Sequence, residues 1–123
     1  MEYTYEIINN YKIIKVEVLG DLIIKESESL GKRIRRKAKR MDYAILFDLT
    51  HIRNRIAANE AYLWYANRRD ILDINFRYIP VAYLINKNQE PLFGPFKIFC
   101  LNNGVLLRIF DEKEKAFEWL KPL

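Results

Sequence analysis

Three polar residues with the potential for chemistry follow directly on an apolar stretch of the chain. Asp48, Thr50 and His51 come just after residues 43–47, a short continuous apolar run that is typical of a strand covered on both faces. Open α/β sheets bind their ligands just beyond the carboxyl ends of such strands. The three side chains are therefore a candidate ligand or partner surface.

Two more polar residues, Asn86 and Asp111, follow later expected strands and could face the same rim. A structural role competes with this interpretation, because Thr50 or Asn54 can cap the following helix and Asp111 can cap the closing one. The chain has a single histidine and a single cysteine, whereas zinc needs three or four protein ligands. We therefore expect no metal, no cofactor and no catalytic residue.

The positive charge of the chain is concentrated in residues 32–40. This segment holds seven of the 21 basic residues and no acid, and the rest of the chain has 14 basic against 16 acidic residues. The candidate polyanion contacts within it are Arg33, Arg35, Arg36, Lys37, Lys39 and Arg40. Such a cluster could bind phosphates of nucleic acid or of anionic lipid headgroups at a membrane surface.

Two observations bear on the partner of this basic segment. No aromatic residue that could stack on a base is interleaved with the basic ones, so nucleic acid is disfavoured. The alternative is a solvated helix face, with the aliphatic stems of the long side chains lying over the core.

A second candidate surface is aromatic. Residues 91–96, Pro-Leu-Phe-Gly-Pro-Phe, are unusually apolar for a loop. The aromatic residues that could join in one groove are Phe93, Phe96, Tyr62, Trp64 and Tyr65. The groove could hold a small apolar ligand or form a homodimer contact, and the competing interpretation is that these rings complete the core.

Composition restricts the class of protein. With 123 residues, half of them hydrophobic, the chain is expected to form one domain over residues 1–123. Cys100 is the single cysteine, lies between Phe99 and Leu101, and is interpreted as a small buried hydrophobe. The absence of a secretion signal, of a disulfide pair and of an apolar run of about 20 residues favours a cytoplasmic protein that does not span a membrane.

The elements that must position these residues alternate along the chain. Strands are expected at residues 3–7, 11–18, 43–49, 79–85 and 105–110, with Asn9-Asn10 forming the tight turn of an opening hairpin. Helices are expected from Gly20-Asp21 to Met41, over 53–73, within the loop and helix 91–101, and after Asp111. Gly31 inside the first helix indicates close packing or a bend, and Gly104 is expected to end the third helix. This order predicts a mixed α/β sheet.

Two short motifs point to a known family of folds. The closing stretch carries Asn103-Gly104, Leu107, Ile109-Phe110-Asp111, Glu114, Ala116 and Trp119-Leu120, and the middle strand ends in Phe47-Asp48-Leu49-Thr50. Both motifs resemble the STAS domain superfamily, the fold of anti-sigma-factor antagonists and SpoIIAA-like proteins. The resemblance implies a sheet of about five strands, an amino-terminal hairpin plus a mainly parallel core, flanked by about four helices.

The sequence departs from this family at its regulatory turn. Antagonists of this kind follow the middle strand with Asp-Ser-x-Gly, whose serine is phosphorylated, whereas residues 52–57 read Ile-Arg-Asn-Arg-Ile-Ala. The phosphorylation switch therefore does not transfer, and the chain looks like the SpoIIAA-like branch. We expect a non-enzymatic regulatory module that binds a protein partner or forms a homodimer. The alternatives are a carrier of a small apolar or amphipathic ligand and, least favoured, an enzyme or a polyanion binder.

Overall fold

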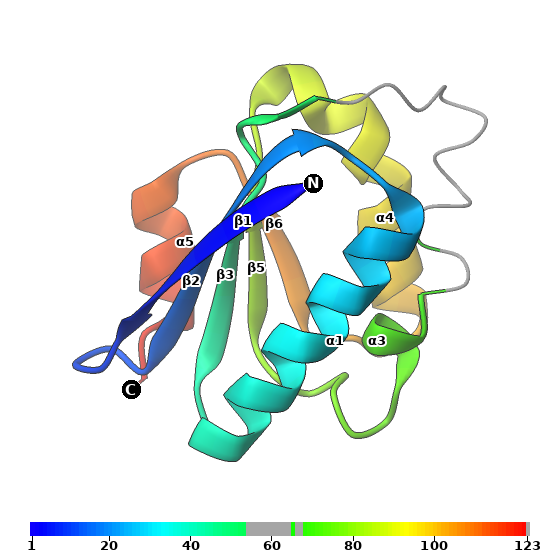
Figure 1. Cartoon of the computed structure of the whole chain (residues 1–123). Coiled ribbons are helices and arrows are strands. Elements are labelled where there is room, and N and C mark those ends of the chain that lie inside the picture. Colours follow the sequence, from blue (N-terminus) through cyan, green and yellow to red (C-terminus); the bar gives the residue numbers. More distant parts are fainter. Residues whose placement is uncertain (54–64, 66–67, 123) are drawn as a thin grey trace.

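A mixed β-sheet organises the computed structural model, which describes residues 1–53, 65 and 68–122 (Figure 1). The strands are β1 (Glu2–Ile8), β2 (Ile13–Asp21), β3 (Ala44–Asp48), β4 (Ile52–Arg53), β5 (Val81–Leu84) and β6 (Leu107–Phe110). They lie in the order β1-β2-β3-β5-β6, and β4 pairs with the far end of β2. The β1–β2 pair is antiparallel and the other pairs are parallel, so the predicted mixed sheet is confirmed.

Helices cover both faces of this sheet. In the described residues they are α1 (Ile24–Met41), α3 (Arg69–Leu72), α4 (Glu90–Asn102) and α5 (Lys113–Leu120), with a 3-10 turn η1 (Lys87–Gln89) before α4. Figure 1 shows α1, α3 and α4 on one face and α5 on the other. Alternate residues of each strand point to opposite faces, so β3 contributes Ile45 and Phe47 to the larger core and Leu46 to the smaller one under α5.

Two element boundaries differ from expectation because tertiary pairing overrides local sequence. Ile8 pairs with Ile13, so residues 9–12 form the connection between β1 and β2, and the positive φ (54°) falls on Lys12 rather than on an asparagine. Gly20 and Asp21 continue β2 instead of opening the helix, because β4 offers them a parallel partner strand. The ion pair between Arg53 Nε and Asp21 Oδ1, at 3.0 Å, adds to that pairing.

The expected aromatic loop at residues 91–96 is helical. It forms the first half of α4, where Pro91 is tolerated because first-turn amides have no helical partner, although Pro95 removes one bond inside the helix. Gly104, with φ of 65°, follows α4 in the left-handed conformation that the sequence predicts. The predicted cap at Asp111 is wrong: α5 begins one residue later, and its N-cap residue Glu112 makes no side-chain cap hydrogen bond.

The expected helix over 53–73 falls largely outside the described residues. Its described end is α3, which is linked to α1 and is followed by loop 73–80, the connection to β5. Helix α3 and loop 73–80 position the site described next.

Candidate functional site

The basic helix α1 divides its charged residues between the interior and the surface. Leu30, Ile34 and Ala38 are buried against the sheet, as their spacing predicts. Arg35, expected at the polyanion surface, is instead only 2% exposed, and its Nη1 donates a hydrogen bond to Asp70 Oδ2 at 2.8 Å. Arg35 is therefore an interior residue, because Asp70 of α3 supplies the counter-charge that burial requires.

Asp70 is the centre of a buried ion cluster, defined here as Arg35, Arg68 and Asp70. Its carboxylate is 0% exposed and also accepts hydrogen bonds from Nε and Nη2 of Arg68, at 2.6 and 2.7 Å. Gly31 leaves room for this arrangement, since a Cβ there would lie 1.9 Å from Asp70 Oδ2. The close packing that a glycine in this helix predicts is confirmed, and the buried ion cluster joins α1 to α3.

The charge state of the buried ion cluster follows from its contacts. Burial disfavours the guanidinium of Arg68, but the hydrogen bonds and negative charge of Asp70 raise the pKa of Arg68 above its ordinary value. Burial also raises the pKa of the Cys100 thiol to about 12, against the opposing effect of Arg35 and Arg68. Cys100 is buried, as expected.

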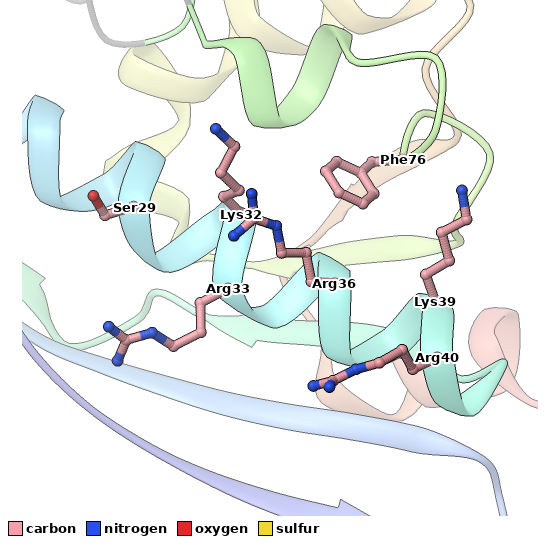
Figure 2. A pocket seen from close by; sticks show the side chains of 7 residues that line it. All are labelled: Ser29, Lys32, Arg33, Arg36, Lys39, Arg40 and Phe76. Carbon is pink, nitrogen blue, oxygen red and sulfur yellow. The ribbon is translucent and has the colours of Figure 1, made fainter.

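Five other basic residues of α1 line an open groove, called here the basic groove, with a volume of about 720 Å³. Its described lining consists of Ser29, Lys32, Arg33, Arg36, Lys39, Arg40 and Phe76. Figure 2 shows the five cationic side chains projecting from successive turns of α1, with Phe76 contributed by loop 73–80. The described lining contains no carboxylate, so the groove has a strongly positive surface.

Neighbouring elements hold parts of the basic groove in place. The Nη1 of Arg33 donates a 2.7 Å hydrogen bond to the hydroxyl of Tyr3 in β1. Lys39 Nζ donates to Asn75 Oδ1 of loop 73–80 at 3.4 Å. Lys37, expected in the same surface, instead places its Nζ 5.5 Å from the ring centre of Tyr5.

The structure therefore refines the predicted basic surface. Arg33, Arg36, Lys39 and Arg40 line the groove together, whereas Arg35 and Lys37 do not. The sequence reasoning missed Phe76, because nothing in residues 73–80, more than thirty positions beyond the helix, indicates that this ring lies beside α1.

The strand-end rim is held together by hydrogen bonds to the backbone. Asp48 Oδ1 accepts from the amide and the hydroxyl of Thr50, at 3.0 and 2.6 Å. Asn86 Nδ2 donates to the carbonyl of Thr50 at 2.8 Å, and Gln89 Nε2 donates to the carbonyl of Leu49 at 2.9 Å. These groups connect the ends of β3 and β5. Thr50 thus has a structural role, but its hydroxyl bonds Asp48 and it precedes β4, so the predicted helix cap at Thr50 is not what the structure shows.

The other rim residues are not gathered into the hollow beside it. This hollow, of about 320 Å³, has Thr50, Ile52, Asn86, Asn88, Gln89, Pro91 and Leu92 as its described lining. His51 is exposed, with Nε2 3.9 Å from Glu17 Oε1, and Asp111 is also exposed. Within residues 1–53, 65 and 68–122, no three His, Cys, Asp or Glu side chains are grouped to hold a metal ion.

Three residues of the predicted aromatic surface, Phe93, Phe96 and Tyr65, form part of the core. Phe93 and Phe96 are fully buried because their helical spacing turns both toward the sheet, where Phe96 stacks on Tyr83 with ring centres 5.4 Å apart. Tyr65 is buried against Phe96 and Phe99. Tyr62 and Trp64 lie outside the described residues.

Two further observations concern apolar ligands and membranes. The interior hollow beside Tyr83 and Arg68 has a volume of about 30 Å³, whereas ligand pockets measure about 300–1,000 Å³. No helix in the described part of the chain is long and apolar enough to cross a membrane.

Comparison with known proteins bears on the fold. No protein-family model matches the sequence, and no curated protein matches it. Among solved structures, the chain is similar to an uncharacterised protein of the DUF3478 family, described as having a SpoIIAA-like fold, from Shewanella loihica PV-4. The two are 15% identical, with a TM-score of 0.59, and the match covers 97% of this chain and 92% of that one. Together with the strand order, this confirms that the chain has a SpoIIAA-like fold.

Proposed function

We propose that this protein is a non-enzymatic binding module that recognises a polyanionic partner through the basic groove. The observation that carries the proposal is the set of five cationic side chains around one open groove whose described lining has no carboxylate. This departs from the order that the sequence suggests, in which a polyanion binder is less favoured than a module for a protein partner or a carrier of a small apolar ligand. The burial of Phe93 and Phe96 leaves the basic groove as the better supported surface.

The expected strength of binding follows from the exposure of these charges. A single exposed ion pair contributes only about 0–1 kcal/mol, so recognition depends on several cations acting on one ligand. Opposite charges along a ligand would meet Lys32, Arg36 and Arg40 within about two turns of the same helix. Because salt screens exposed pairs beyond about 8 Å at physiological ionic strength, affinity should fall steeply as salt is added.

Local anchoring supports this role. The hydrogen bond from Arg33 to Tyr3 restrains one guanidinium, and the buried ion cluster joins the helix to α3. A ligand would then need to order fewer groups on binding, which reduces the entropic cost of association.

The test is binding of inorganic polyphosphate, measured by calorimetry at about 50 mM and about 200 mM salt. We expect binding that weakens with salt, and a loss of at least about tenfold in the double variant Arg36→Glu/Arg40→Glu, because two attractive contacts become repulsive. Lys87→Glu/Lys97→Glu is the matched control, since it makes the same change in net charge at exposed sites outside the groove. Equal losses in both variants would show a response to net charge alone and contradict the proposal.

A further inference from the structure

Loop 73–80 carries two exposed apolar side chains next to the basic groove. Ile74 is 69% exposed and Tyr78 is 67% exposed, whereas Phe76 between them is buried in the groove wall. Phe76 and the Lys39–Asn75 hydrogen bond tie the loop to α1, so the apolar pair belongs to the same region of the molecule as the cations.

Hydrogen bonds within loop 73–80 hold its backbone in a defined turn. Asp73 Oδ1 accepts hydrogen bonds from the amide and side chain of Asn75, at 2.8 and 3.0 Å. The amide of Phe76 donates to the carbonyl of Asp73, and Arg77 Nη2 donates to the carbonyl of Leu72. These bonds fix a turn that buries Phe76 and presents Ile74 and Tyr78 to solvent.

We propose that the basic groove and loop 73–80 together bind the surface of an anionic membrane; this rests on the polyanion binding proposed above. A cluster of cations on one helix is attracted to acidic headgroups without needing a particular ligand shape. Ile74 can insert into the boundary between headgroups and acyl chains, and Tyr78 suits the interface because it is both apolar and polar. Cations alone would serve a soluble polyanion, so the apolar pair is what favours a lipid surface.

The geometry fits a surface better than an enclosed ligand. The groove is open, and its cations run from Lys32 to Arg40, a distance of about 12 Å along the helix axis. A row of that length can meet several headgroups at once. Asp73 is the one acidic residue among residues 73–80, and its carboxylate accepts a hydrogen bond from the amide of Asn75.

The test is co-sedimentation with phosphatidylcholine vesicles containing roughly 30% phosphatidylserine, compared with phosphatidylcholine alone. We expect binding only to the anionic vesicles, and a reduction of about tenfold in Ile74→Ser/Tyr78→Ser because two inserted side chains are lost. The matched control is Ile98→Ser/Leu101→Ser, which removes two apolar side chains of α4 that are 60% and 71% exposed. It should change binding by less than about twofold.

The two proposals are separated by a second measurement on the same variants. Ile74→Ser/Tyr78→Ser should keep the affinity for inorganic polyphosphate, because the groove cations are unchanged. Polyphosphate binding without vesicle binding, or vesicle binding unaffected by Ile74→Ser/Tyr78→Ser, would overturn the membrane proposal and leave the proposed function standing. Binding of a polyglutamate peptide with no vesicle binding would assign the groove to an acidic protein and overturn it likewise. If the unaltered protein binds neither polyphosphate nor anionic vesicles, the proposed function itself is refuted.

Discussion

Gly31→Ala should destabilise the protein, although the same change at an ordinary helix position is favourable by about 1 kcal/mol. The added Cβ would lie 1.9 Å from Asp70 Oδ2, 2.7 Å from Arg35 Nη1 and 2.9 Å from Arg68 Nη2. These atoms cannot simply move aside, because they bond one another in the interior. Breaking a buried ion pair costs about 3–5 kcal/mol, so we expect a net loss of about 2–4 kcal/mol in the free energy of unfolding.

Urea unfolding followed by circular dichroism measures this change. An unaltered m-value, the slope of unfolding free energy against urea concentration, would show that both proteins unfold in the same transition. Gly94→Ala is the control, since it is also a helical glycine but a Cβ there meets nothing within 4 Å. We expect Gly94→Ala to change stability by less than about 1 kcal/mol. If Gly31→Ala is stabilising, the close packing of Gly31 against the buried ion cluster is refuted.

Two further predictions concern Cys100 and Trp119. Because the folded pKa of Cys100 is raised from 9.0 to about 12, its stabilising contribution is complete below pH 9 and is lost as pH rises toward 12. Urea titrations across that range should show Cys100→Ala losing stability less steeply than the unmodified protein, and an equal slope in both would contradict the assignment. Trp119→Ala should lower the free energy of unfolding by about 1.5–3 kcal/mol, which is less than the cost for a core Trp because the ring is only partly buried. The centre of the Trp119 ring lies 5.9 Å from that of Phe110 and 5.3 Å from the guanidinium of Arg108. A loss under about 0.5 kcal/mol in thermal unfolding would show that α5 does not dock through this ring.

The fold could be predicted from local patterns because the central strands are short, continuous apolar runs separated by helical periodicity. The middle strand at Ala44–Asp48 and the left-handed Gly104 are examples. Prediction failed where a distant segment decides the outcome. Gly20 and Asp21 join the sheet only because β4, more than thirty positions further along the chain, lies beside them.

The part of the candidate site that depends on a local pattern could also be predicted. A dense run of bases on one helix is visible in the sequence, and four of the six selected residues line one groove. The spacing of Gly31, Arg35 and Ala38, four and then three positions apart, does place Arg35 on the buried face. Its counter-charge Asp70 lies 35 positions away in the chain, so nothing local to the helix shows that the burial is compensated.

The buried ion cluster has a consequence for the basic groove. Asp70 lies three residues before Asp73, where loop 73–80 begins, and that loop forms one wall of the basic groove while α1 forms the other. The width of the groove is thus set from inside the molecule, by a carboxylate that no ligand can touch. Interior substitutions around Asp70 would therefore change the spacing between loop 73–80 and α1, and with it the shape of the basic groove.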